Sequence, residues 1–276
     1  MSASRIKNLI LLILLLAVLC LLIAVVPTRA AQARSLYARN AELEKLLADY
    51  EISVEAALLP ESATLYSLEL AQTDAAAAAQ ALLGADAVRE ERSTRYESSY
   101  SAAAGSLTVT SSGAFEAVVS GRKPAGNIEK DAQKVLRAMG FQADDIRTLR
   151  TGDGQYTVTA GQSLLGAAVF SEGLQLFYED NALCALRGVF YPGGEQLTRI
   201  SETSCIGCAD ALVRLLTCRN ELGWVGSKIL RVRQGFLPSE SASGAMRFAP
   251  CWRIDTDTDS FYVNGITREV RSIEAG

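Results

Sequence analysis

Residues Ile128–Phe141 read IEKDAQKVLRAMGF, and the pattern of this stretch recurs along the chain. Four of its apolar residues stand at i, i+3, i+4 and i+7, the spacing of a buried helix face: Ala132, Val135, Leu136 and Met139. Gly140 follows directly, and glycine is common just after the last helical turn because it adopts the left-handed cap conformation without strain. The stretch therefore predicts an amphipathic helix that ends at a glycine.

The same pattern predicts two further helices, over about 74–83 and 209–222, which end at Gly84 and Gly223. Strand-like sequence with turn residues between the strands follows each helix. Runs of strands after each helix favour antiparallel α+β layers over a doubly wound βαβ sheet. We therefore expect an α+β fold of antiparallel-sheet subdomains with packed helices. The expected subdomains are an N-terminal one over 51–123 and a C-terminal part over 124–276.

An apolar segment lies near the start of the chain, since every residue from Leu9 to Val26 is apolar and Pro27 ends the run. At about 1.5 Å per residue this segment spans roughly 27 Å, the thickness of the hydrocarbon layer of a bilayer. The alternative is a cleaved signal peptide, whose apolar region usually has about 7–15 residues. The sequence thus predicts one transmembrane helix over 9–26 and a short cytoplasmic tail over 1–8.

Two features of the predicted membrane-proximal region suggest how it could meet other helices. Ala17, Cys20 and Ala24 stand at i, i+3 and i+7, and small residues on one stripe allow close packing of membrane helices. A juxtamembrane helix is expected over 27–50, where Leu36, Leu43 and Tyr50 recur every seven residues. This helix either packs on its own domain or forms a short coiled coil with a partner.

Composition excludes several function classes. The chain has no histidine, which removes Ser–His–Asp and Cys–His catalysis and the histidine-containing zinc motifs. Its net charge of −4 gives no electrostatic reason to bind nucleic acid. We therefore expect no enzymatic activity, no cofactor, no metal and no nucleic-acid partner.

Cys205 and Cys208 form a CxxC motif at the start of a predicted helix. A helix N-terminus lowers a thiol pKa, so the pair could be redox-active. The pair could also be half of a zinc site, with Cys218 and Cys251 as the other ligands. Structural thiols or a local disulfide are the remaining interpretation. Five of the 6 cysteines, all but Cys20, follow the apolar run. Because five is an odd number, these cysteines cannot all form disulfides with one another within the domain.

The C-terminal segments Arg247–Ile254 and Phe261–Thr267 resemble the C-terminal signature of the YycH/YycI family. In that family a Pro-x-Trp strand precedes a Tyr-Val-Asn strand and a turn. Further segments are similar to the family: Ala209–Leu222, Gln234-Gly235-Phe236, Leu59-Pro60 and Leu82-Leu83-Gly84. The cysteines depart from the pattern, and Thr267-Arg268-Glu269 replaces its usual Thr-Gly-Glu-like turn.

The resemblance implies a membrane-anchored regulator of Gram-positive bacteria with PepSY-like extracytoplasmic domains. Family members associate with a sensor histidine kinase, partly through membrane helices. The charges that flank the apolar run do not decide its orientation, whereas the resemblance places the N-terminus in the cytoplasm. We expect a single-pass cell-membrane protein that modulates such a kinase, a paralogous regulator or another cell-envelope partner. The alternative is a membrane-tethered thiol redox protein or sensor that uses Cys205 and Cys208.

Overall fold

The computed structural model describes residues 14–16, 38–70, 75–91, 93–94, 96–124, 126–193 and 196–273. Most of these residues belong to three successive units, each a helix followed by four strands. The first unit contains α2 (Ala76–Leu83), β2 (Val88–Arg89), β3 (Glu97–Ala102), β4 (Gly105–Thr110) and β5 (Ala114–Arg122). The second contains α3 (Ile128–Ala138), β6 (Ala143–Gly152), β7 (Gln155–Leu164), β8 (Ala167–Glu179) and β9 (Ala182–Val189). The third contains α4 (Cys208–Thr217), β11 (Ile229–Glu240), β12 (Met246–Thr256), β13 (Ser260–Asn264) and β14 (Val270–Ile273).

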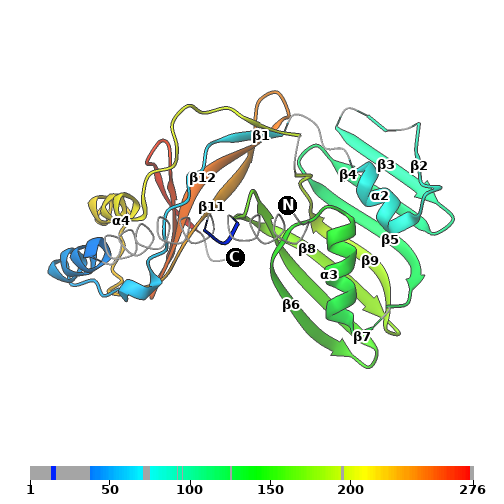
Figure 1. Ribbon diagram of the computed structural model, residues 1–276, viewed down its shortest axis with the longest axis horizontal. Coiled ribbons are helices and arrows are strands. Elements are labelled where there is room, and N and C mark those ends of the chain that lie inside the picture. Colours follow the sequence, from blue (N-terminus) through cyan, green and yellow to red (C-terminus); the bar gives the residue numbers. More distant parts are fainter. Residues whose placement is uncertain are drawn as a thin grey trace, which may run out of the picture.

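The first two units form one continuous antiparallel sheet in the order β6-β7-β8-β9-β5-β4-β3-β2. The final strands of the two units, β5 and β9, pair with each other at its centre. Both helices, α2 and α3, cover the same face of this sheet (Figure 1). A sequence division at 123/124 thus falls between the two helix–strand units, although the sheet continues across it through β5 and β9.

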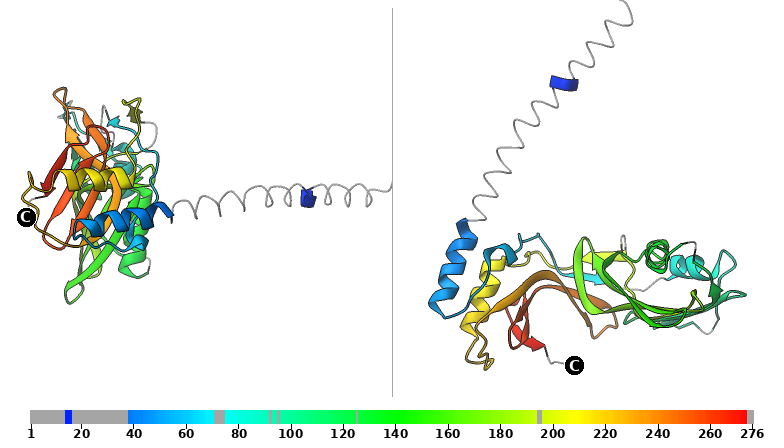
Figure 2. Two further views of the ribbon diagram at one scale, coloured as in Figure 1. Left: turned by 90° about the vertical axis from the view of Figure 1, so that its left-hand side faces the viewer. Right: turned by 90° about the horizontal axis from the view of Figure 1, so that it is seen from below.

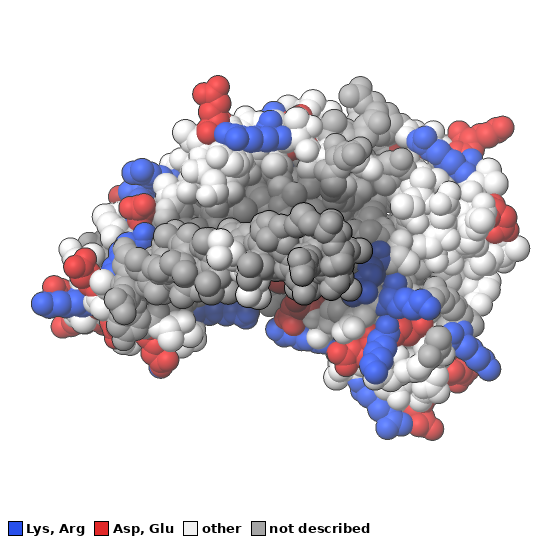
Figure 3. Space-filling model, viewed as in Figure 1, with Lys and Arg blue, Asp and Glu red and all other residues white. Residues whose placement is uncertain are grey.

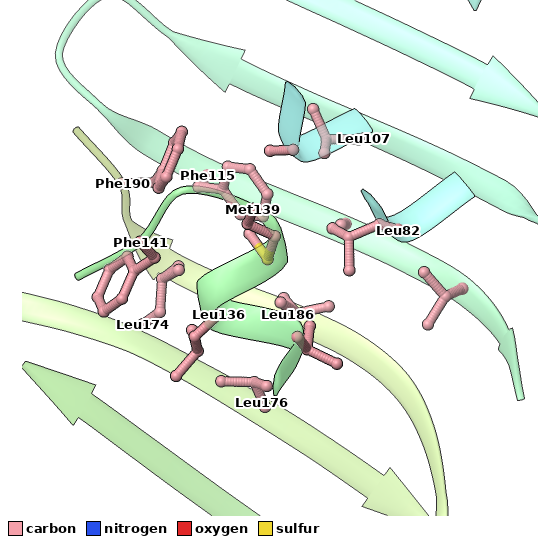
Figure 4. Close-up of a cluster of buried hydrophobic side chains, with 14 of the residues drawn as sticks. Leu82, Leu107, Phe115, Leu136, Met139, Phe141, Leu174, Leu176, Leu186 and Phe190 are labelled. Atoms are coloured by element: carbon pink, nitrogen blue, oxygen red, sulfur yellow. The ribbon is translucent and has the colours of Figure 1, made fainter. Parts of the chain in front are cut away.

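The core of this sheet lies beneath α3. The helix begins after Asn127, whose side chain accepts a hydrogen bond from the backbone N–H of Lys130 at 2.9 Å. The face predicted from the apolar spacing is buried against residues of β5, β8 and β9, as Figure 4 shows for Leu136 and Met139 beside Phe115, Leu174 and Leu186. The predicted helix is confirmed, and Gly140 follows it at a φ of +79°.

The third unit has its own core on the face of β11–β13 that α4 covers (Figure 1). A helix over 38–49 lies beside α4 in both views of Figure 2. Its Leu43 and Leu47 are buried in the same cluster as Leu212 and Leu215 of α4. Leu43, one of the residues of the seven-residue repeat, therefore packs on its own domain. This agrees with the first interpretation of the segment, a helix packed on its own domain, rather than with a coiled coil formed with a partner.

Short elements complete the edge of the third unit. The 3₁₀ turn η1 (Ala56–Leu58) leads to β1 (Leu68–Leu70), which pairs with the start of β12. On its other side β1 pairs with β10 (Leu197–Arg199). A third hydrophobic cluster, which includes Phe236 and Phe248, fills the space beneath these strands.

Each unit is an antiparallel sheet, as expected from the sequence, but the combined sheet is mixed. The second and third units join through β8 and β11, which run parallel with Gly235 opposite Ala168 and Phe236 opposite Val169. The pairing brings together strands of two different units, whose relative direction no turn fixes. Local sequence patterns predict hairpins, and therefore antiparallel neighbours, but they carry no information on such a contact.

The third helix ends earlier than its apolar spacing predicts. We expected it to reach residue 222, whereas α4 ends at Thr217 and the chain continues as turns to Gly223. The side chain of Arg219 is used by the loop that follows the helix. It donates hydrogen bonds to the carbonyls of Trp224 and Gly226, and to that of Tyr50 in the segment after helix 38–49.

Most of the expected membrane segment falls outside the described residues. Of residues 9–26 the structure describes 14–16, which are helical and exposed. The tail 1–8 and residues 27–37 also lie outside. Among the residues that the structure does describe, no helix is both long enough and apolar enough to cross a membrane.

Candidate functional site at the junction of the second and third units

A cleft of about 450 Å³ lies where the second and third units meet. It is open to solvent, and its size falls within the range of about 300–1,000 Å³ typical of small-ligand sites. Its lining comes from β6, β7, β8, β11, β12 and β13, and we call it the junction cleft. Its residues are Asp144, Asp145, Arg147, Thr159, Gly161, Ala168, Val169, Phe170, Ser171, Glu172, Arg233, Arg253 and Tyr262.

Strand register places two arginines side by side in this cleft. Arg233 of β11 is directly opposite Arg253 of β12, and Arg253 is directly opposite Tyr262 of β13. Directly opposed residues of antiparallel strands share one face of the sheet, here the face that α4 does not cover. Like charges in this arrangement are destabilising unless something neutralises them.

One of the two arginines is neutralised within the chain. Arg253 Nε donates to Asp255 Oδ1 at 2.8 Å, and the hydroxyl of Ser260 donates to the same oxygen at 2.7 Å. Burial alone would raise the pKa of Asp255, but these hydrogen bonds and the charges of Arg253 and Arg233 hold this pKa below its usual value. Asp255 is therefore an ionised carboxylate at neutral pH and is committed to Arg253.

Arg233 is not neutralised in this way. Its Nε is buried and has no hydrogen-bond partner among the described residues. Its guanidinium carbon lies 5.5 Å from the ring centroid of Phe170, a cation–π contact. Burial, with the nearby charges of Arg231 and Arg253, lowers the pKa of Arg233 from its ordinary value, although the charges of Asp255 and Asp144 act in the opposite direction. A guanidinium nevertheless stays protonated in proteins, so the cleft contains a partly buried cation.

The cleft also has an aromatic wall and a second buried polar atom. The rings of Phe170 and Tyr262 lie 5.5 Å apart between centroids. Next to Phe170, the hydroxyl of Ser171 is buried and has no partner among the residues that the structure describes. A buried hydroxyl and a buried guanidinium N–H are both donors that a ligand oxygen could accept from.

Acidic residues also line the cleft. Asp145 forms an ion pair with Arg147 at 2.8 Å, and both side chains are largely exposed. Asp144 and Glu172 are exposed, and neither belongs to an ion pair of the described residues. The cleft therefore carries the partly buried cation of Arg233, which the charges of Asp255 and Asp144 offset in part, and two carboxylates that form no ion pair among the described residues.

Cys205 and Cys208 lie away from the cleft, at the N-terminus of α4. The backbone N–H of Cys208 donates to the hydroxyl of Ser62 at 3.0 Å, and the indole of Trp252 donates to the carbonyl of Ile206 at 2.9 Å. Both thiols are free. Burial raises the pKa of Cys208 to about 12 and also raises that of Cys205. These shifts are opposite to the lowered pKa that activates a redox thiol.

Cys251 lies near Cys205, since the charge of Cys205 acts on the pKa of Cys251, and Gln234 and Trp252 hydrogen-bond to Cys205. Cys218 and Cys251 are buried free thiols, and the part of the chain that the structure describes holds no cluster of three His, Cys, Asp or Glu residues placed to bind a metal. The other sequence-predicted residues, Ala17, Cys20 and Ala24, lie outside the described residues.

Sequence reasoning missed the cleft residues because they lie on strands of two units. The signal that could have indicated them is weak: Arg231 and Arg233 alternate with apolar residues ahead of Gly235, as in many half-exposed strands. On the face shown in Figure 3, Lys and Arg are interspersed with Asp and Glu.

Comparison with known proteins gives no family. No protein-family model matches the chain, and no curated protein matches it. Among solved structures, it is similar to an uncharacterized protein from Eubacterium rectale ATCC 33656, with 9% identity, coverage of 76% of this chain and 81% of that one, and a TM-score of 0.45. It is also similar to the Bacillus megaterium YpeB C-terminal domain, with 10% identity, coverage of 72% and 95%, and a TM-score of 0.35. At these scores neither likeness assigns the chain to a family.

Proposed function

We propose that this protein is a non-enzymatic, single-pass membrane regulator of the YycH/YycI type, whose PepSY-like domain lies outside the cell. It modulates a sensor histidine kinase or another cell-envelope partner through protein contacts. The proposal rests on the apolar run 9–26, on the resemblance of the C-terminal strands, and on the way in which helix 38–49 is attached to the domain.

The attachment of helix 38–49 is the observation that carries the proposal. Leu47 is fully buried against α4, and Arg219 holds the carbonyl of Tyr50 at 3.0 Å. The helix therefore belongs to the core of the third unit, and it follows the apolar run closely in sequence. A helix fixed at this end can transmit a change in the domain to a membrane segment, as a flexible linker cannot.

Two features favour a binding role over catalysis. The chain has no histidine, and the thiols of the CxxC motif are buried with raised pKa values. The redox alternative needs an accessible thiolate near neutral pH, which these shifts disfavour. The junction cleft, in contrast, has the size and the mixed polar and aromatic lining of a ligand site.

The experiment that tests the proposal uses the full-length chain with a C-terminal affinity tag in native membranes. Crosslinking, affinity capture and mass spectrometry identify the partner, and autophosphorylation of a captured kinase is measured with and without the protein. We expect a sensor kinase to be captured and its activity to change. Replacement of residues 9–26 by an unrelated membrane helix should abolish both effects.

Two controls distinguish the alternatives. A C-terminal alkaline phosphatase fusion should be active, since this enzyme folds only outside the cytoplasm, and an inactive but expressed fusion would contradict the topology. The Cys208→Ser variant should still capture the kinase. If it instead traps partners through mixed disulfides at Cys205 while no kinase is captured, the thiol redox function replaces the one proposed here.

A further inference from the structure

We propose that the junction cleft binds a short zwitterionic peptide, whose C-terminal carboxylate lies against Arg233 and Ser171 and whose ammonium group lies towards Asp144 and Glu172. The inference does not depend on the membrane partner or on the topology. It rests on the charges, the buried polar atoms and the shape of the cleft.

The carboxylate end of the ligand follows from the arginine pair. Arg253 is committed to Asp255 at 2.8 Å, whereas Arg233, directly opposite it, has a buried Nε with no partner in the described part of the chain. An anion beside the guanidinium of Arg233 would neutralise the like-charge pair, and the Ser171 hydroxyl, which belongs to the lining of the same cleft and lacks a partner among the described residues, is a further donor. A planar carboxylate matches the geometry of a guanidinium, which donates two parallel hydrogen bonds.

The ammonium end follows from the acidic residues of the lining. Asp144 and Glu172 line the same cleft, and neither has an ion-pair partner among the described residues. They repel a polyanion such as a phosphate ester and attract a cation. Asp145 adds no net charge, because Arg147 pairs with it at 2.8 Å. The cleft is therefore complementary to a molecule that carries one charge of each sign.

The size of the cleft favours a peptide over a free amino acid. Its volume of about 450 Å³ exceeds what a single amino acid fills, and its lining comes from both the second and the third unit. The rings of Phe170 and Tyr262, 5.5 Å apart, offer an apolar wall for the atoms between the ligand's two ends.

The test is calorimetric titration of the full-length protein in detergent micelles with four probes. Trialanine carries both charges, trialanine amide lacks the carboxylate, N-acetyl-trialanine lacks the ammonium group, and inorganic phosphate is an anion alone. We expect trialanine to bind at least about tenfold more tightly than either capped peptide, since each cap removes one charged contact. Phosphate should bind more weakly still.

Variants assign the binding to the cleft. Arg233→Gln should weaken trialanine binding by at least about tenfold and should remove the difference between trialanine and its amide. The matched control is Arg231→Gln, two residues away on the same strand but exposed and outside the cleft; it should change affinity by less than about twofold. Ser171→Ala is a second, smaller change that should weaken binding a fewfold in a folded protein.

Three outcomes would overturn the proposal. The first is no detectable binding of trialanine to a protein that melts cooperatively. The second is phosphate binding as tight as trialanine binding, which would make the cleft a simple anion site. The third is trialanine binding that neither Arg233→Gln nor Ser171→Ala weakens, which would place the peptide elsewhere.

Discussion

The carbonyl oxygen of Ala168 occupies the space next to Gly235 that a side chain would need. A Cβ atom on Gly235 would lie 2.3 Å from that oxygen and 2.9 Å from the ring of Phe170. The two residues are partners in the parallel pairing of β8 and β11, which joins the second and third units. The absence of a side chain at this position therefore permits the contact that forms both the mixed sheet and the junction cleft.

The first prediction is that Gly235→Ala destabilises the protein and disturbs the cleft. Backbone atoms of β8 cannot give way as the end of a flexible side chain can, so we expect a loss of about 1–3 kcal/mol in the free energy of unfolding. Urea unfolding followed by circular dichroism measures it. Gly126→Ala is the control, because a Cβ there meets nothing within 4 Å, and its effect should be below about 0.5 kcal/mol. Equal stability of the two variants would contradict the role assigned to Gly235.

Arg219 joins three separate pieces of the third unit. Its guanidinium donates to the carbonyls of Tyr50, Trp224 and Gly226 at 3.0–3.2 Å and lies 5.3 Å from the ring of Trp224. Leucines dominate the helix before it, and the arginine appears in the sequence only as a polar residue at an apolar position. The structure explains it as the group that satisfies the carbonyls of the loop.

The second prediction concerns this arginine. Arg219→Ala should lower the free energy of unfolding by about 2–4 kcal/mol, because three carbonyls lose a charged donor and two of these contacts are partly buried. Arg150→Ala is the matched control, since Arg150 pairs with a fully exposed Asp153 and should contribute below about 1 kcal/mol. Thermal melting of the two variants compares them directly. A smaller effect for Arg219 than for Arg150 would show that water replaces its hydrogen bonds.

The sequence was sufficient to predict the local structure but not the arrangement of the units. The helices expected over about 74–83 and 128–139 are present as α2 and α3, and strands follow each of them. Each depends on a period of apolar residues or on a turn within a short segment. The β8–β11 contact joins residues 168 and 235, and no pattern within either segment specifies its partner.

The same limit applies to the candidate site. The CxxC spacing of Cys205 and Cys208 can be read directly from the sequence. The role of these thiols depends on their burial, which raises the pKa of Cys208 to about 12 and cannot be read from the spacing. Arg233, Phe170 and Asp144 form the cleft only after three segments come together. In sequence each is an unremarkable residue of a strand that is polar on one face.

The third prediction separates the two interpretations of helix 38–49. Leu47 is fully buried against α4, whereas its neighbour Leu46 is 39% exposed. Leu47→Ala should cost about 2–5 kcal/mol of unfolding free energy, as is usual for a buried leucine, and Leu46→Ala less than about 1 kcal/mol. Urea unfolding of both variants measures this. If the helix instead pairs with a partner helix through Leu46, the Leu46→Ala variant would no longer be crosslinked to that partner. The Leu47→Ala variant would then be as stable as the parent protein.

The last prediction concerns alkaline pH. Burial favours the protonated thiol of Cys208, so its pKa rises from the ordinary 9.0 to about 12, and burial likewise raises the pKa of Tyr191 from 10.0 to about 12. The unfolded chain therefore releases these protons first as pH increases. The stabilisation from each group is complete below its unfolded pKa and is lost as pH rises towards 12.

The free energy of unfolding should fall by up to about 1.4 kcal/mol per pH unit for each such group, between pH 9 and 12 for Cys208 and between pH 10 and 12 for Tyr191. Urea unfolding at pH 8, 9.5 and 10.5, in the presence of a reductant, measures this slope. Cys208→Ala should make the slope shallower, because one group no longer titrates, whatever its effect on stability at pH 8. Cys184→Ala should change the slope less, since Cys184 is less buried, although burial raises the pKa of its thiol as well. If Cys208→Ala leaves the slope unchanged, the thiol is accessible in the folded protein, and the redox alternative regains support.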